Sequence, residues 1–386
     1  MRAIILKEFR ELARDKRTLA MLILLPILLL VIFGYAANFS VDRVTAVVVG
    51  EDAQKLASDV EEYDTAIDGI DIIRVDSSLR EDDAAEILRT QEADAVIVAL
   101  LNDDDEAPLA NRMSVLLDGS ALFSAQAAQG TVIALAAEDL ERQADNISDA
   151  VAAAVATGVP PEFEAPTLDP DELITVLFNP DLKTSWVMVP GLIGLILLFI
   201  GALITSIGLV RERETGTLEQ LAVMPLRPAA IIFGKITPYF LLALIDMAVI
   251  TALGAWLFDV PFRGSLLLFS FAGIIFLFVV LGIGVLISTA SQNTGQAIQM
   301  AILFVVPQVL LSGLIFPLDS MPLGVRWFGY ILPLTWFREV AQGVMIRGAE
   351  VESLWLPLTI LTALAVLAFG LAIARMRRSL THGGTR

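Results

Sequence analysis

The chain has 386 residues, of which 56% are hydrophobic and only 18% are charged, and its formal net charge is −18. Soluble domains are about 45–50% apolar and about 25% charged, so this composition indicates a membrane protein. The acidic balance excludes a nucleic-acid-binding protein, which needs a basic face. The absence of cysteine excludes a thiolate metal site, and the single histidine, His382, excludes histidine-based catalysis and histidine metal clusters.

The first 37 residues predict a surface helix followed by a membrane-crossing one. Residues 1–18 place apolar side chains at helical spacing among charges, which fits an amphipathic helix in the cytoplasmic interface, although a merely charged leader fits equally well. Residues 19–37 carry no charge and are long enough to span the bilayer. A signal peptide cleaved near Gly34-Tyr35-Ala36 is the alternative, and the acids Glu8 and Asp15 in the leader argue against it.

Residues 38–183 hold 32 Asp and Glu against 8 Lys and Arg and predict a folded α/β domain. The expected strands are Val44–Val49, Ile70–Val75, Ala95–Leu100 and Met113–Leu117. The expected helices are Ala53–Tyr63, a helix opened by a Ser78–Glu81 capping box and ending at Arg89, and the alanine-rich stretch Ala121–Ala156. The acidic run 103–106 fits a solvated turn better than a calcium loop, whose ligand spacing it lacks.

Five further apolar stretches predict transmembrane helices within residues 184–386, which makes six in all. They are Ser185–Val210, Ile236–Phe258, Ser265–Ala290, Ile298–Phe316 and Ser353–Ala374. Basic residues gather in the N-terminal segment, in the connection 211–229 and in the tail 375–386, so the positive-inside rule places all three in the cytoplasm. Residues 38–183 and an outer re-entrant segment, 317–352, then face outward.

The predicted fold class is therefore a polytopic α-helical membrane protein with six transmembrane helices and an inserted extracytoplasmic α/β domain. We expect it in the cell (plasma or inner) membrane, with both termini cytoplasmic.

Two features of the apolar frame have a functional interpretation. Asp246 is an isolated acid near the middle of a predicted span, where a charge costs at least about 2.5–3.5 kcal/mol. It predicts either a proton- or cation-handling site or a hydrogen-bonded acid that joins helices, and its isolation favours the second. The outer segment fits an aromatic belt or, as the alternative, an exit gate for an amphipathic substrate. The gate candidates are Trp327, Trp336, Phe337, Arg338 and Glu339.

The connection from Arg211 to Pro228 has the sequence RERETGTLEQLAVMPLRP. Gly216 allows a sharp turn, Thr217 is an N-cap candidate for a short helix, and Pro225 ends that helix. A short helix at the membrane surface fits a docking element for a soluble subunit, although on charge alone an ordinary positive-inside loop is the better interpretation. The chain has no phosphate-binding loop, so energy for transport must come from a partner or an ion gradient.

This connection resembles the coupling region of ABC exporter permeases of the type-2 family, in which Glu-x-Gly-Thr-x-Glu precedes a short helix and a proline. Glu214, Gly216, Thr217 and Glu219 match that motif, and Met224 stands where the family has a serine. The segments 287–299, 307–322 and 332–349 (ISTASQNTGQAIQ, PQVLLSGLIFPLDSMP and LPLTWFREVAQGVMIRGA) resemble later parts of the family. VLLDGS (115–120) and FNPDL (178–182) fit its subgroup with a large extracytoplasmic domain.

The resemblance implies the permease subunit of an ATP-driven exporter, with no catalytic residue and no metal of its own. ATP and Mg²⁺ would be bound by a separate cytoplasmic ATPase subunit. The residues that would couple to this subunit are Glu212, Glu214, Gly216, Thr217, Glu219 and Pro225. A second permease chain, identical or a sister, and the lipid bilayer are further expected partners, and an extracytoplasmic adaptor is an open one. Two other functions stay open: a secondary transporter that uses Asp246 with an ion gradient, and a non-transporting receptor that presents its outer domain.

Overall fold

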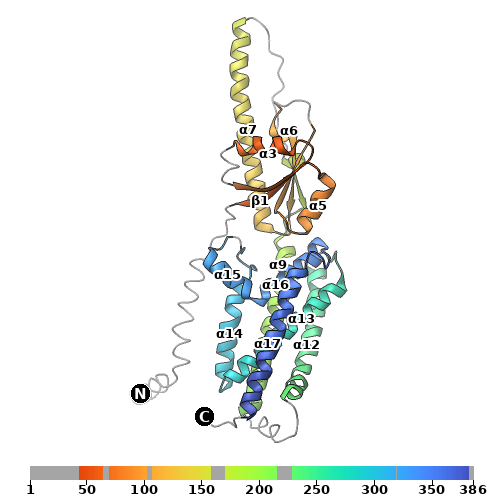
Figure 1. The fold of residues 1–386 in the computed structure, drawn as a ribbon, viewed down its shortest axis with the longest axis vertical. Helices are drawn as coiled ribbons and strands as arrows, with labels where there is room; N and C mark the ends of the chain where they lie inside the picture. Colours follow the sequence, from red (N-terminus) through yellow and green to blue (C-terminus); the bar gives the residue numbers. More distant parts are fainter. Residues whose placement is uncertain are drawn as a thin grey trace, which may run out of the picture. The chain divides into compact units, whose positions relative to one another are not determined.

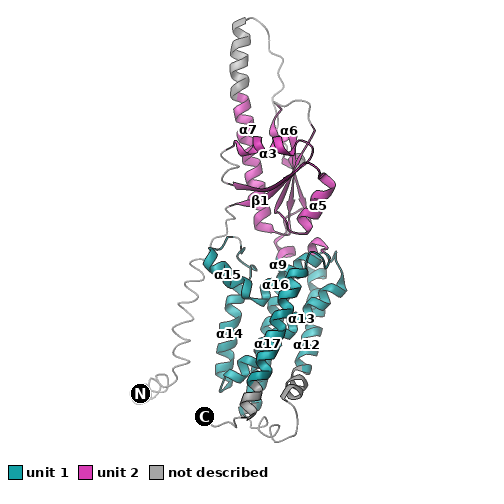
Figure 2. Ribbon diagram, in the orientation of Figure 1, with its two compact units in different colours: residues 1–39, 188–345, 350–386 teal, residues 40–187, 346–349 magenta. Residues whose placement is uncertain are grey.

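The computed structural model describes residues 43–63, 69–101, 107–157, 170–214, 228–318 and 320–381. The predicted interfacial helix (1–18), the first predicted span (19–37), the acidic run 103–106 and most of the coupling segment (215–227) lie outside these ranges. The chain divides into two compact units (Figure 2). We call residues 40–187 and 346–349 the α/β unit, and residues 1–39, 188–345 and 350–386 the helical unit.

The α/β unit is built on a five-stranded sheet with the order β2-β1-β3-β4-β5. Its strands are β1 (Val44–Val49), β2 (Ile70–Asp76), β3 (Ala95–Ala99), β4 (Met113–Asp118) and β5 (Ile174–Leu177). β1 pairs in parallel with β2 and β3, β4 is antiparallel to β3, and β5 is parallel to β4. The four predicted strands coincide with β1 to β4. The sequence prediction lacks β5, because its four residues are too few to show a period of two.

Helices cover both faces of this sheet. They are α3 (Ala53–Glu61), α5 (Glu81–Arg89), α6 (Leu109–Arg112), α7 (Leu122–Thr157) and α8 (Pro170–Leu173). Because side chains alternate along a strand, Val48 of β1 joins the core under α3 and α7, whereas Val47 joins the core under α5. Figure 1 shows α5 on the opposite side of the sheet from α3 and α7. Burial on both faces explains why β1 and β3 are almost continuous apolar runs.

The start of α5 corrects the predicted capping box. The helix begins at Glu81, and the backbone N–H of Arg80 donates to the Asp83 carboxylate at 3.0 Å. Ser78 instead donates its N–H (3.0 Å) and its hydroxyl (2.6 Å) to Asp76 Oδ1 in the turn after β2. The Ser78–Glu81 capping box is therefore wrong, because the turn already engages Ser78 before the helix starts.

The helical unit contains a set of helices and most of one long rod, whose first four residues belong to the α/β unit. The rod consists of α9 (Thr184–Phe199), the π-helical turn η1 (Ile200–Ile204) and α10 (Thr205–Glu214). The other elements are α12 (Pro228–Leu257), α13 (Leu266–Ala290), α14 (Thr294–Leu311), α15 (Leu323–Ile331), α16 (Pro333–Gln342), η2 (Gly343–Arg347) and α17 (Trp355–Thr381). The last element before α17, η2, crosses from the helical unit into the α/β unit between residues 345 and 346.

Within the described ranges, five helices are long and apolar enough to cross a membrane. They are Thr184–Glu212, Tyr239–Leu257, Leu266–Ala290, Thr294–Leu311 and Trp355–Arg375. These five coincide with the second to sixth predicted spans. The structure also reveals what hydropathy does not indicate: a π-helical turn interrupts the first of them at Ile200–Ile204.

The helix α13 lies at the centre of the helical unit and contacts α10, η1, α12, α14, α16 and α17. Its Phe276 is fully buried and stacks on Phe337 of α16, with ring centroids 4.4 Å apart. Glycine allows the closest approach to η1, because a Cβ on Gly284 would lie only 3.0 Å from the Gly201 carbonyl oxygen. The centre of the unit is therefore fixed by direct helix contact.

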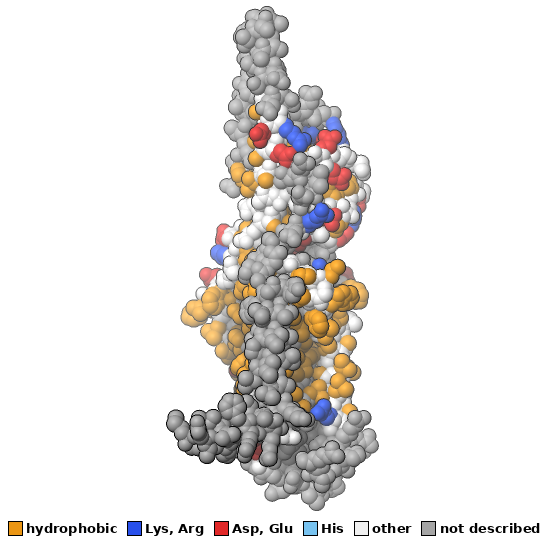
Figure 3. Space-filling view, turned by 90° about the vertical axis from the view of Figure 1, so that its left-hand side faces the viewer, with side chains coloured by type: hydrophobic (Ala, Val, Ile, Leu, Met, Phe, Trp, Pro, Cys, Tyr) orange, Lys and Arg blue, Asp and Glu red, His pale blue; other side chains and the backbone are white. Residues whose placement is uncertain are grey.

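Surface chemistry differs sharply between the two units. On the face drawn in Figure 3, hydrophobic side chains dominate the described surface of the helical unit, whereas acidic and basic side chains gather on the α/β unit. Leu242 of α12, Leu267 of α13 and Val366 of α17 are at least 57% exposed. So much exposed apolar surface on spanning-length helices is expected where lipid covers them.

Candidate functional site

At one end of the helical unit, two sequence motifs that lie 80 residues apart come together: the start of the coupling region and the turn between α13 and α14. α10 ends at Glu214, and Val210, one turn earlier, is fully buried. Val210 belongs to an apolar cluster with Ile287 of α13 and Ala297 and Ala301 of α14. The position of Glu214 is therefore set by the packing of α10 on two other helices.

Two side chains supply hydrogen-bond acceptors to the first turn of α14. Asn293 caps it, because its Oδ1 accepts from the Gln296 N–H at 2.9 Å. The N–H and the hydroxyl of Thr294 both donate to the Glu214 carboxylate, each at 2.8 Å. A helix N-terminus has unpaired N–H groups and a partial positive charge, so a carboxylate is favourable there. Glu214 thus fastens the end of α10 to the start of α14.

These hydrogen bonds also fix the protonation state of Glu214. The backbone N–H of Thr294 is the largest cause, followed by the threonine hydroxyl, and they hold the pKa of Glu214 below its ordinary value. Arg211 nearby acts in the same direction, and slight desolvation opposes it. Glu214 is therefore a carboxylate at neutral pH, which is the form that accepts both hydrogen bonds.

The remaining predicted coupling residues divide into two groups. Glu212 is half-buried in the last turn of α10, whereas Gly216, Thr217, Glu219 and Pro225 fall outside the described ranges. Both motifs are visible in the sequence, but the role of Thr294 is not. The sequence offers only a glutamate at the end of one helix and a threonine at the start of another. The packing of α10 on α14 is what shows that these two side chains meet.

Asp246 lies on the flank of α12 and not on its most exposed face. Ile245 and Val249 are 59% and 50% exposed, while Ala243 and Met247 are buried against the bundle. Asp246 is half-buried between these two faces. No hydrogen bond or ion pair joins it to another residue among those that the structure describes.

The aromatic gate candidates on α15 and α16 do not share one environment. Phe337 is fully buried in the core against Phe276. Trp336 is 7% exposed, and its indole N–H donates to the Tyr330 carbonyl at 2.7 Å. Trp327 is 69% exposed. Of the three, only Trp327 has the exposed position that a membrane-interface side chain occupies.

The charged gate candidates lie beside these aromatics on α16. Arg338 is half-buried and donates from Nη1 to Gln342 Oε1 at 3.0 Å, and its neighbour Glu339 is half-buried as well. The guanidinium lies against the backbone of Gly313, where an added Cβ would be 2.8 Å from Nη2. Gly313 directly follows the C-terminus of α14, where a cation complements the partial negative charge of the helix. The Arg338 guanidinium therefore lies next to the chain that leaves the end of α14.

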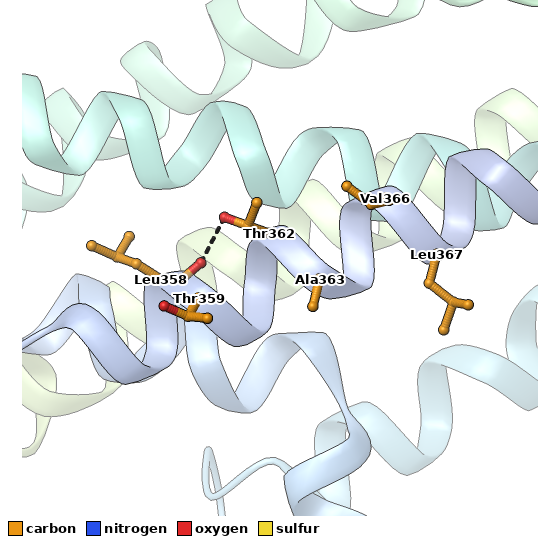
Figure 4. Close-up of a pocket in the computed structure, with 6 residues that line it drawn as sticks. All are labelled: Leu358, Thr359, Thr362, Ala363, Val366 and Leu367. Carbon is orange, nitrogen blue, oxygen red and sulfur yellow. Dashed lines mark hydrogen bonds between the residues drawn. The ribbon is translucent and has the colours of Figure 1, made fainter.

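A groove on the surface of α17 is lined mainly by apolar groups. It is lined by Leu358, Thr359, Thr362, Ala363, Val366 and Leu367 (Figure 4). The hydroxyls of Thr359 and Thr362 donate at 2.7 Å to the carbonyls of Trp355 and Leu358 of the same helix. With both hydroxyls engaged, the groove presents methyl and methylene groups. Among the described residues, no group of three or more His, Asp or Glu side chains is placed to hold a metal ion.

Five apolar helices, four of them packed around the fifth, α13, and charged connections at their ends define a polytopic helical membrane protein. The chain belongs to the ABC-2 family of transporter proteins, whose sequence description matches residues 16–374. It is 29% identical over 390 residues to the probable multidrug ABC transporter permease YbhS of Escherichia coli K12, which covers 98% of this chain and 97% of that protein. It is 28% identical over 379 residues to the probable multidrug ABC transporter permease YbhR of the same organism, with 97% of each chain covered.

A third relative is similar over a shorter stretch. The inner membrane transport permease YhhJ of Escherichia coli K12 is 32% identical over 206 residues, which is 53% of this chain and 54% of that protein. These findings confirm the family resemblance that the sequence motifs indicate. The chain is a membrane permease subunit of an ABC transporter, a class in which a separate subunit hydrolyses ATP.

Proposed function

We propose that this permease is one half of an ATP-driven exporter and that residues 212–225 receive the motion of the ATPase subunit. The observation that carries the proposal is the pair of hydrogen bonds between Glu214 and Thr294. They join the start of the coupling segment to α14, while the cluster around Val210 joins it to α13. A displacement of residues 215–225 therefore acts on three membrane-crossing helices together.

The two glutamates of the family motif then have different roles. Glu214 accepts two hydrogen bonds from its own chain, so it positions the coupling segment. Glu219 lies five residues further along, in the segment that matches the family's docking helix, and we assign to it the contact with basic side chains of the ATPase subunit. Glu212, Gly216, Thr217 and Pro225 complete the coupling segment, and the partner binds ATP and Mg²⁺.

The names of two relatives, probable multidrug ABC transporter permeases, support an amphipathic drug-like compound as the substrate class. Basic residues in segments 1–18, 211–229 and 375–386 support cytoplasmic placement of both termini and of the coupling segment, with the α/β unit outside the cell membrane. A second permease chain, identical or a sister, completes the translocation path. Residues 19–37 supply the first of the six spans.

Purification of the tagged chain from its native membrane in mild detergent tests the coupling assignment. We expect a stoichiometric P-loop ATPase subunit and ATP hydrolysis with the wild-type chain. Glu219→Lys is expected to lose that subunit, because the reversed charge meets a basic docking surface, and Glu214→Gln is expected to retain it. Glu86→Lys, which reverses an exposed acid of the α/β unit, is the matched control. A wild-type chain that is isolated alone even after crosslinking would contradict the exporter proposal.

A secondary transporter that uses Asp246 is the second candidate, because this acid is half-buried inside an apolar helix. Asp246→Asn distinguishes the two. In the exporter it should leave complex assembly and ATP hydrolysis unchanged. Loss of transport in a fully assembled complex, together with a transport rate that follows an imposed proton or cation gradient, would instead establish ion coupling.

A further inference from the structure

Three segments that are far apart in the sequence meet at one end of the sheet in the α/β unit. They are the turn 118–120 at the end of β4, the turn 178–183 after β5, and the short segment 346–349, which begins in the last two residues of η2. Each belongs to one of the family-like motifs VLLDGS, FNPDL and LPLTWFREVAQGVMIRGA. The coupling function described above uses none of the three.

The first two turns are joined by Asn179, which is fully buried. Its Nδ2 donates to the Gly119 carbonyl and to the Lys183 carbonyl, each at 3.2 Å, and its Oδ1 accepts from the Lys183 N–H at 2.9 Å. Gly119 also donates its N–H to the Leu177 carbonyl at 3.0 Å. A side chain on Gly119 would lie 2.8 Å from the carbonyl oxygens of Leu177 and Asn179, so this position needs glycine.

Arg347 brings the third segment into the same place. Its Nη1 donates to Ser120 Oγ at 3.1 Å and lies 4.0 Å from Asp118 Oδ2. The side chains of Arg347 and Asp118 are each only 2% exposed. Asp118 in turn accepts from the Ser120 N–H at 2.9 Å. A guanidinium and a carboxylate are thus paired out of contact with water, with Ser120 hydrogen-bonded to both.

The chain just before Arg347 is held in the helical unit. The carbonyls of Val344 and Met345 accept hydrogen bonds from the N–H groups of Gly264 and Arg263, at 2.9 and 3.0 Å. Arg347 follows two residues later and is packed in the α/β unit. The Cα atoms of two residues that are two positions apart can be separated by at most about 7 Å. A larger displacement of Met345 must therefore also displace Arg347.

Breaking such a pair is unfavourable, because each charge would be left buried without its partner. A contact that opened once in every transport cycle would meet this penalty each time. The burial of both side chains therefore favours a contact that persists through the cycle.

We propose that Arg347 and Asp118 are positioning residues for transport: they form a permanent anchor through which residues 343–347 move the α/β unit during the cycle. This inference rests on the proposed transport function and adds a role for the α/β unit. Asn179 supports the anchor from the side, because it ties the Gly119 turn to the residues that lead directly into α9.

The chain contains no cysteine, so a pair of introduced cysteines can be crosslinked without background. The test uses Ser120→Cys/Arg347→Cys in the complex with its ATPase subunit, joined by a short bismaleimide. Before crosslinking, we expect ATP hydrolysis to fall at least about tenfold, as for loss of one partner from a buried charge pair. After crosslinking, the covalent bridge replaces the anchor, and we expect most of the activity to return.

Two controls separate the anchor from general stability. Arg112→Gln/Asp59→Asn removes another ion pair of the α/β unit, so it should lower the melting temperature with little change in ATP hydrolysis. Ser120→Cys alone, treated with the same reagent, accounts for the effect of the linker itself. A crosslinked complex that forms but stays inactive would overturn the proposal, because it would mean that the contact must open. A wild-type chain without ATPase activity would instead count against the proposed function.

Discussion

At the residue scale, Glu214 is the side chain whose removal tests one contact without disturbing the core. Glu214→Gln keeps the shape but removes the charge, and Thr294→Val removes the hydroxyl from the other side. Each should lower the melting temperature of the purified chain by about 1–2 °C, because loss of one helix-terminal contact shifts the melting temperature less in a chain of 386 residues than in a small domain. Because both changes break the same contact, the double variant should lose less than the sum of the two. Strict additivity in thermal unfolding would show that the two residues act independently.

The same contact should make stability depend on pH in a defined direction. The pKa of Glu214 is lowered in the folded chain, so the unfolded chain binds more protons in the window between the two pKa values. The contribution of Glu214 is then complete above the ordinary glutamate value of 4.5 and is lost as the pH falls through the lowered value. Melting temperatures of wild type and Glu214→Gln, measured between about pH 3 and 7, should therefore converge at the acidic end. A difference that stays constant over this range would contradict the assignment.

At the element scale, helix contacts through glycine differ in what a methyl group would meet. A Cβ on Gly264 would lie 2.5 Å from the Val344 carbonyl oxygen, which the backbone holds in place. On Gly273 it would meet the sulfur of Met247 at 2.3 Å, the end of a flexible side chain. We therefore expect Gly264→Ala to destabilise the chain by about 1–3 kcal/mol and Gly273→Ala by clearly less. Thermal unfolding of the two variants in the same detergent measures the difference. Equal losses of stability would show that contact with the backbone is unimportant.

Long elements, whose apolar residues form a clear run or repeat, could be predicted from the sequence. Short elements, and those that depend on tertiary packing, could not. The spans around Phe276 and Leu361 are long apolar runs, and β1 and β3 are short β-branched ones, so both kinds are visible in composition. β5 and the π-helical turn η1 have no such signal, because four or five residues show no period. At the site, hydropathy and motif order located the coupling region, whereas the Glu214–Thr294 contact depends on how α10 packs against α14.

Burial also separated residues that the sequence grouped together. Phe337 and Trp327 are both aromatic residues of one predicted outer segment, yet the first is fully buried and the second is 69% exposed. Their difference comes from the helices they lie on, since α16 packs against the central helix α13, whereas α15 packs mainly against α14 and α16. Composition indicates an aromatic cluster, and only the tertiary packing decides which of its members can meet lipid or substrate.

At the scale of the whole molecule, Asp118 should respond to one substitution in opposite ways in two contexts. In the full chain, Asp118→Asn leaves the Arg347 guanidinium buried without its partner, which costs about 3–5 kcal/mol. A fragment of residues 40–187 keeps both apolar cores of the sheet but lacks Arg347. Burial already raises the pKa of Asp118, and in the fragment no guanidinium opposes that rise.

The fragment should therefore lose stability as the pH rises from the ordinary aspartate value toward the raised one, because the folded state binds more protons than the unfolded state in that window. Asp118→Asn removes this loss and should stabilise the fragment at neutral pH, while the same change lowers the melting temperature of the full chain. Urea unfolding of the fragment and thermal unfolding of the full chain measure the direction of the stability change that Asp118→Asn causes in each. If both were destabilised, the carboxylate form of Asp118 would be favourable in the α/β unit even without the Arg347 guanidinium.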